Sequence, residues 1–272
     1  MTKHLVLGNG ESRAWFNPSE KKIVTNDVIT WGCNAIYRDV MVDNLVAVDY
    51  GMQQEIYETS FYKDNQCWFA NWSRLPAEVA DVLFMGYDIP KEFIHRSKIK
   101  KEHCVVSGKD PSSLQDKISA AIDQNPSLDM KDLRMKMEKD VGVWITYVDE
   151  EDSINTIDFP VGWSAGNTAM HLACQQGATE IYILGFDLSS YDEPLNNIYK
   201  GTDNYLSSDA RGFNPVNWQN QMQTVFREFK DVQFSWVVSR PWDWPDAKEE
   251  LIQENNLSYL TKTQFCDKLN IL

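Results

Sequence analysis

Five aspartates in this 272-residue chain stand at the ends of expected strands or in a long polar loop near residue 200, where a carboxylate can do chemistry. They are Asp49, Asp187, Asp192, Asp203 and Asp209. Such a carboxylate can act as general base for an acceptor hydroxyl, or it can hold a divalent cation over a diphosphate. The alternative for each of them is an ordinary solvated loop acid. We expect them to gather along one edge of a sheet.

A glycine-rich turn follows the first apolar run of the chain. Gly8 and Gly10 let the backbone approach a ligand, because no Cβ atom stands in the way. The backbone N–H groups that follow can hold phosphate oxygens, and Asn9 or Ser12 can add a side-chain donor. Arg13 stands where the dinucleotide fingerprint Gly-x-Gly-x-x-Gly has its last glycine, so that motif is absent. The alternative is a tight strand-to-helix turn without a ligand.

The long polar loop reads NNIYKGTDNY over residues 196–205. Loops of more than about a dozen residues in a compact domain often act as lids. Tyr199, Lys200 and Tyr205 can close over a donor phosphate and stabilise the charge of a leaving group. The alternative is an ordinary surface loop. The four histidines have no metal-ligand spacing, so we expect structural roles for them and no metal site.

Seven short apolar runs, bounded mostly by Gly, Asn or Asp, predict the buried strands that position these residues. They are Leu5–Leu7, Val28–Trp31, Leu45–Val48, Trp68–Phe69, Val143–Val148, Ile181–Leu184 and Phe234–Val238. Amphipathic patterns predict helices over 113–123, 130–140 and 164–176, the last ending at Gly177 because glycine tolerates positive φ. Two further helices are expected beyond Pro241.

Strands that alternate with helices predict an α/β fold with an open, doubly wound, mainly parallel sheet of the Rossmann-like type. We expect a single nucleotide-binding domain over residues 1–272, with a largely helical insertion over 86–156. In such sheets ligands bind at the carboxyl ends of the strands. Asn34 after the second strand, Asp49 after the third and Ser164 at a helix start would all lie on that rim.

Four stretches carry a family resemblance. VLGNGES, WGCNAIY, LVAVD and SAGNTAMHLACQQGATEIYILGFDL together resemble the bacterial sialyltransferases that use CMP-sialic acid. They also resemble a related family of phage and bacterial proteins that includes the hydroxymethylpterin pyrophosphokinases. The resemblance covers roughly residues 3–50 and 160–240, nearly half of the chain. It is specific to the superfamily and less so to one activity.

The resemblance implies a role for each matching residue. Asn9 and Gly10 would approach the phosphate or ribose of the nucleotide, and Asn34 would lie beside the donor. Ser164 and Gly166 would open the helix whose N-terminus faces the sugar or phosphate. The nucleotide pocket would be lined by Gly185 and by Asp187, whose carboxylate suits ribose hydroxyls.

One departure from the family concerns the general base. The sialyltransferases carry a histidine before the helix that corresponds to residues 217–229, and here Asn214 stands near that place. A neutral amide cannot take a proton, so the base would be an acid, Asp49 or Asp209. An acid flanked by Tyr and Trp in this loop should have a pKa raised toward the working pH.

The composition of the chain limits the partners and the cell compartment that we expect. The net charge of −14 makes tight binding of nucleic acid unexpected. Five scattered cysteines without a Cys-x-x-Cys pair predict reduced thiols, and no charged-then-apolar leader precedes Leu5. No apolar run is long enough to span a membrane. We therefore expect a cytoplasmic protein, in the host cytoplasm if a phage encodes it, and leave a homo-oligomer open.

The preferred hypothesis is a glycosyltransferase that moves a sugar from a nucleotide sugar to an acceptor by direct displacement. The nucleotide or nucleotide sugar is the expected partner, and no cofactor is expected beyond this donor. One alternative is a pyrophosphokinase or another nucleotide-dependent phosphotransferase, which would need Mg²⁺. A second alternative is a non-catalytic nucleotide-binding protein that lacks the base.

Overall fold

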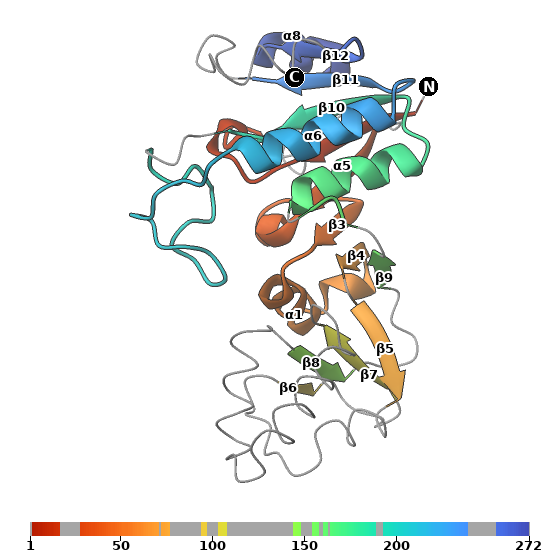
Figure 1. Cartoon of the computed structure of the whole chain (residues 1–272), viewed down its shortest axis with the longest axis vertical. Coiled ribbons are helices and arrows are strands. Elements are labelled where there is room, and N and C mark those ends of the chain that lie inside the picture. The colour runs from red at the N-terminus through yellow and green to blue at the C-terminus, as the bar shows by residue number, and fades with distance from the viewer. Residues whose placement is uncertain are drawn as a thin grey trace, which may run out of the picture. The chain divides into compact units, whose positions relative to one another are not determined.

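The computed structural model divides the chain into two compact units (Figure 1). One unit comprises Met1–Val46 and Pro160–Leu272, and the other comprises Ala47–Phe159. The structure describes residues 2–16, 28–70, 72–76, 94–96, 103–107, 144–147, 154–157, 160–162, 164–188, 193–238 and 254–271. The expected arrangement was one domain with an insertion starting at residue 86. The second unit begins earlier, directly at the end of the third strand.

A parallel sheet forms the centre of the first unit. Its strands are β1 (Lys3–Leu7), β2 (Val28–Cys33), β3 (Asn44–Ala47), β10 (Glu180–Leu184), β11 (Gln233–Val237) and β12 (Leu257–Leu260). Their order is β12-β11-β10-β1-β2-β3, and every neighbouring pair is parallel. The sequence prediction of a Rossmann-like α/β fold is therefore confirmed.

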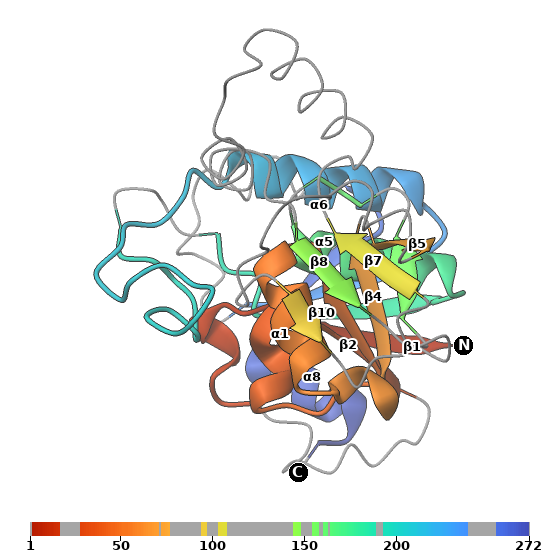
Figure 2. The ribbon, with the colours of Figure 1, turned by 90° about the horizontal axis from the view of Figure 1, so that it is seen from below.

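Helices cover both faces of this sheet (Figures 1 and 2). On one face, α5 (Ala165–Gln175) lies beside α6 (Val216–Glu228), and Phe226 packs on Phe234 of β11 with ring centroids 4.7 Å apart. On the other face, Phe265 of α8 (Lys262–Leu269) packs against Tyr182 of β10. Successive side chains of a strand point to opposite faces, and Phe234 pairs with Ile181, the neighbour of Tyr182. The two helix layers therefore lie on opposite sides.

Local capping explains where the helices begin and end. Ser164 accepts a hydrogen bond from Asn167 N at 3.1 Å, which satisfies one free N–H at the start of α5. Gly177 takes a φ of +85° just after the helix, as the sequence predicts. Thr261 and Gln264 form a capping box at the start of α8.

The second unit holds α1 (Tyr50–Glu58) and two groups of strands. β4 (Gln66–Ala70) and β9 (Asn155–Ile157) pair in parallel, while β5 (Trp72–Pro76), β7 (His103–Ser107), β8 (Trp144–Tyr147) and β6 (Ile94–Arg96) form a four-stranded sheet in the order β5-β7-β8-β6. Gln53 is fully buried, and its Nε2 donates to Ala47 O at 3.0 Å and Ala70 O at 2.8 Å. This amide joins Ala47 and Ala70 within the second unit.

All seven expected strands are present, whereas most of the residues on which further helices are expected lie outside the described part of the chain. The described residues within 86–156 form strands, not helices, and the expected helices over 113–123 and 130–140 lie outside the described residues. Two closing helices are expected beyond Pro241; over the described residues 254–271 the structure has the strand β12 and then the helix α8, and residues 241–253 lie outside the described part of the chain. Leu257–Leu260 is too short to be distinguished as a strand by periodicity, and its pairing with β11 decides its conformation.

His4 in β1 is a fully buried imidazole. Its Nδ1 accepts a hydrogen bond from Trp31 Nε1 at 3.0 Å, so the proton is on Nε2, which has no partner among the described residues. Burial lowers the pKa of His4 below its ordinary value of 6.5, against the opposing effect of the negative Asp43. The folded protein therefore binds the second imidazole proton, the one that makes His4 cationic, less readily than the unfolded chain does.

We expect His4 to make stability depend on pH. Above pH 6.5 neither state binds the proton, whereas below it the unfolded chain does, so stability falls as the pH drops. The contribution can reach about 1.4 kcal/mol per pH unit. Urea denaturation of wild type and His4→Gln between pH 7.5 and 5.5 measures it. Equal slopes for the two proteins would contradict this role.

Candidate functional site

The chain leaves the centre of the first unit's sheet in two directions. β1, β2 and β3 follow one another toward one edge, while β10, β11 and β12 follow one another toward the other. The reversal lies between β1 and β10, and ligands of open parallel sheets bind outside the carboxyl ends of the strands at such a point. The candidate site is therefore the turn after β1 and the turn after β10.

These two turns are bonded directly to each other. Gly8 N donates to Leu184 O at 2.8 Å, and Gly10 N donates to Gly185 O at 2.9 Å. A Cβ atom on Gly8 would lie 2.3 Å from Gly185 O, and one on Gly10 would lie 2.5 Å from Asp187 Cγ. Both glycines are therefore required by the neighbouring turn of the protein itself, whatever a ligand requires.

Asp187 holds the turn after β1. Its two carboxylate oxygens accept from Ser12 N, at 2.8 Å, and from Ser12 Oγ. Burial raises the pKa of the Asp187 carboxyl, although the hydrogen bonds from Ser12 and Asn196 act in the opposite direction. The sequence prediction places this residue at the site, and the structure gives its carboxylate a positioning role there.

Several backbone N–H groups of the turn donate to acceptors within the protein. Glu11 N donates to Asn196 Oδ1 at 2.8 Å, Ser12 N donates to Asp187, and Arg13 N donates to Gly10 O at 3.2 Å. The sequence suggests that these groups hold phosphate oxygens. In this structure they are used instead to join the turn to its neighbours.

Asn9 carries an unused acceptor at the site. Its Nδ2 donates to Cys33 O at 3.2 Å and to Tyr205 Oη at 3.0 Å. A carbonyl such as Cys33 O can only accept, which fixes the orientation of the Asn9 amide. Asn9 Oδ1 is then buried without a hydrogen-bond partner in the described part of the chain. An unsatisfied buried acceptor costs about 1–3 kcal/mol, so a donor from a ligand or an ordered water would stabilise it.

Asn34 and the start of α5 lie at the same edge of the sheet as Asn9. Asn34 begins the short helix η2 (Asn34–Arg38) directly after β2, with a left-handed φ of 51°. The ring of Phe186 lies between the turn after β1 and the start of α5, since a Cβ on Gly8 would meet it at 2.9 Å and one on Gly166 at 3.0 Å. The structure thus brings the start of α5, after Ser164, to the same edge.

The loop over residues 193–215 is closed at its base and extends from this edge of the first unit (Figures 1 and 2). Leu195 N donates to Ala210 O at 2.9 Å, and Gly212 N donates to Glu193 O at 2.9 Å. We call residues 194–211 the strap. Its links to the turn after β1 include Ile198 N to Asn9 O, at 2.9 Å.

Tyr199 and Lys200 attach the strap to the site. Tyr199 is 5% exposed, and its hydroxyl accepts from Arg13 Nη2 at 2.8 Å and donates to Asp39. Lys200 Nζ lies 2.6 Å from Glu11 Oε1. The sequence suggests that these residues meet a leaving phosphate, but here both are occupied by protein partners.

The proposed proton acceptors stand in different places. Asp209 is an exposed residue of the strap, and a hydrogen bond from Ser207 lowers the pKa of its carboxyl instead of raising it as the sequence suggests. Asn214 accepts from Val216 N at 3.0 Å, at the start of α6. Asp49 precedes α1 in the second unit, and Asp192 lies outside the described residues.

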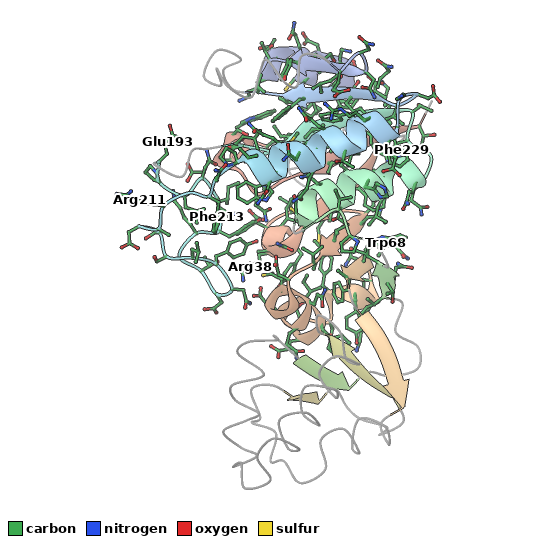
Figure 3. All side chains as sticks on the ribbon, viewed as in Figure 1. Arg38, Trp68, Glu193, Arg211, Phe213 and Phe229 are labelled. Carbon is green, nitrogen blue, oxygen red and sulfur yellow. The ribbon has the colours of Figure 1, made fainter. Side chains whose placement is uncertain are left out.

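Sequence reasoning missed two partners of Tyr199. Arg13 is only 1% exposed, and Asp39 lies near the end of η2. Arg38 also reaches the strap, donating to Thr202 Oγ1 at 2.7 Å (Figure 3). The one signal in the sequence was an arginine directly after Gly-Asn-Gly-Glu-Ser, and only the fold shows that it is buried.

Comparisons with known proteins add no family and no relative to these observations. No protein-family model matches this chain, and no curated protein or solved structure matches it. Among the residues that the structure describes, no group of three His, Cys, Asp or Glu side chains is placed to hold a metal ion. None of the described helices has the length and apolar character needed to cross a membrane. The fold and its edge define a Rossmann-like α/β protein.

Proposed function

We propose that the protein binds a nucleotide-activated sugar at the carboxyl edge of the first unit's sheet and transfers the sugar to an acceptor hydroxyl. The resemblance to CMP-sialic-acid-dependent transferases and the reversal of strand order between β1 and β10 support this proposal. The observation that carries it is the buried, unpartnered Asn9 Oδ1.

An unpartnered acceptor selects the chemistry of its ligand. A phosphate that is ionised at neutral pH offers oxygen acceptors and no suitable donor, so phosphate alone leaves Asn9 Oδ1 unsatisfied. A ribose or sugar hydroxyl can donate to this oxygen. The site therefore favours a ligand that carries hydroxyl groups in addition to phosphate, as a nucleotide sugar does.

The transfer itself requires one proton acceptor. The acceptor's hydroxyl oxygen attacks the anomeric carbon, the bond from that carbon to the phosphate oxygen breaks, and the nucleotide leaves with the electron pair. The hydroxyl proton moves to a carboxylate, for which we propose Asp209 of the strap. Asp187, which already accepts two hydrogen bonds from Ser12, is proposed as a positioning residue.

We expect Asn9→Leu to weaken binding of a nucleotide sugar about tenfold, because it removes the acceptor at nearly unchanged size. A thermal-shift titration of CMP-, UDP- and GDP-sugars identifies the nucleotide and compares the variants. Asn220→Leu, on an exposed position of α6, is the matched control and should bind as wild type does. Equal affinities of wild type and Asn9→Leu would remove Asn9 from the site.

The same titration separates the alternatives. A shift that requires Mg²⁺ and a nucleoside triphosphate favours the pyrophosphokinase. Binding of nucleotide sugars without transfer or hydrolysis of any of them favours a non-catalytic binding protein. If no nucleotide or nucleotide sugar raises the melting temperature at millimolar concentration, the proposed function is wrong.

A further inference from the structure

Arg13 is a buried cation without a carboxylate partner in the described part of the chain. Its side chain is 1% exposed. Its Nε donates to Gly8 O at 2.5 Å and its Nη2 donates to Tyr199 Oη at 2.8 Å, and both acceptors are neutral. Burying a charge without a partner is costly, because the interior replaces little of the lost hydration. Such an arrangement is expected where an anion binds.

Tyr199 occupies the place that an anionic oxygen would take. Its hydroxyl oxygen accepts from the guanidinium of Arg13, while its proton is donated to Asp39. Burial is the largest effect on the Tyr199 hydroxyl and raises its pKa well above the ordinary value of 10.0, so the group is neutral at physiological pH. The negative charge of Asp39 is thus linked to Arg13 through a neutral hydroxyl.

Four backbone N–H groups of the turn are already used within the protein. The N–H groups of Gly10, Glu11, Ser12 and Arg13 all donate to acceptors of the protein. A guanidinium has five N–H donors in a planar fork that matches two phosphate oxygens. Of these donors, the N–H of Nε and one N–H of Nη2 donate to acceptors of the protein.

The strap carries Tyr199 as part of a unit closed on itself. Its ends are joined through Leu195 and Ala210, and Gly201 N donates to Leu206 O at 2.7 Å within it. Several links between the strap and the turn after β1 or η2 are polar, including the ion pair of Lys200 with Glu11, and the buried ring of Tyr199 adds cation–π contacts with Arg13 and Arg38. Polar links of this kind exchange readily for links to water or to a charged ligand.

We propose that Arg13 is the phosphate-binding residue of this site, and that the strap covers it until an anion displaces the hydroxyl of Tyr199. Arg13 then binds the phosphate next to Asn9, which binds a hydroxyl of the same ligand. The assignment of the phosphate to a nucleotide rests on the proposed function, whereas the anion site itself does not.

Inorganic pyrophosphate is the probe, and isothermal titration calorimetry measures its affinity. Arg13→Gln should weaken binding at least tenfold, because it removes the charge and the fork of donors. Tyr199→Phe should tighten binding about three- to tenfold, because it removes the competing hydroxyl and leaves the ring. Arg227→Gln, an exposed change of the same net charge on α6, should leave the affinity unchanged.

Each measured affinity either supports the proposed anion site or overturns it. Unchanged pyrophosphate affinity in a folded Arg13→Gln protein overturns the proposal, as does failure of the wild type to bind pyrophosphate. If Arg13→Gln does not fold, Tyr199→Phe decides, since a merely structural Arg13–Tyr199 contact predicts equal or weaker binding. Nucleotide-sugar binding that Arg13→Gln leaves intact would overturn this inference alone. Pyrophosphate binding without any binding of nucleotides would overturn the proposed function alone.

Discussion

Gly8→Ala is expected to destabilise the first unit by about 3 kcal/mol or more, at the upper end of the cost of overpacking a core. The new Cβ would lie 2.3 Å from Gly185 O and 2.9 Å from the ring of Phe186. Gly185 O belongs to backbone at the end of β10, which the sheet holds in place, so neither side can move away cheaply. Urea denaturation measures the loss, and ligand binding should fall with it.

Gly177→Ala is the matched control for this change. A Cβ on Gly177 meets nothing within 4 Å, and only its φ of +85° opposes substitution, at about 1–2 kcal/mol. Gly10→Val should resemble Gly8→Ala, because its Cβ would lie 2.5 Å from Asp187 Cγ. Wild-type stability in either turn variant would show that the two turns are not held as closely as the structure indicates.

Asp209→Asn is expected to lower the rate of sugar transfer about 10²–10⁴-fold, since an amide cannot accept the acceptor's proton. Nucleotide-sugar affinity should change little, because Asp209 is an exposed residue outside the contacts of the turn. Asp231→Asn is the matched control, being an exposed acid outside the strap that is not a candidate base, and should keep the wild-type rate within about threefold. Steady-state kinetics with the donor found by thermal shift measure both.

The pH profile tests the same assignment. A general base acts only when ionised, and the hydrogen bond from Ser207 lowers the pKa of Asp209 below its ordinary 3.8. The acid side of the profile should therefore be flat from about pH 5 upward as far as this residue is concerned. A rate that rises through neutral pH, or a full rate in Asp209→Asn, would point to another base, and Asp49→Asn would then be measured next.

The edge of the sheet has two layers of contact. The inner layer is the pair of turns joined by Gly8, Gly10 and Asp187, and it acts on stability. The outer layer is the strap, joined through Tyr199 and Lys200, and it acts on access to Arg13. A change in the inner layer should alter folding and binding together, whereas a change at Tyr199 or Lys200 in the outer layer should alter binding alone.

The sequence by itself determined the elements that carry the site. Short apolar runs predicted seven of the strands that the structure contains, and the caps Ser164 and Gly177 predicted the bounds of α5. Both kinds of signal are local, because burial and the satisfaction of backbone N–H groups act over a few neighbouring residues. The glycines and polar residues at the ends of β1 and β10 predicted which edge of the sheet to examine. These are local properties, so they can be read from consecutive residues.

Only the tertiary structure decided which partner each of these residues takes. Gly8 and Asp187 are 179 positions apart, and their turns meet because β1 pairs with β10. Asn196 and Asp187, which follow β10, accept from N–H groups that the sequence predicts would hold a phosphate. The sequence shows Arg13 only as the residue that replaces the last glycine of the dinucleotide fingerprint, whereas in the structure the turn and the strap bury it against Gly8 O and Tyr199 Oη. Burial and hydrogen-bond partners depend on segments distant in the chain, and the local pattern carries no information about them.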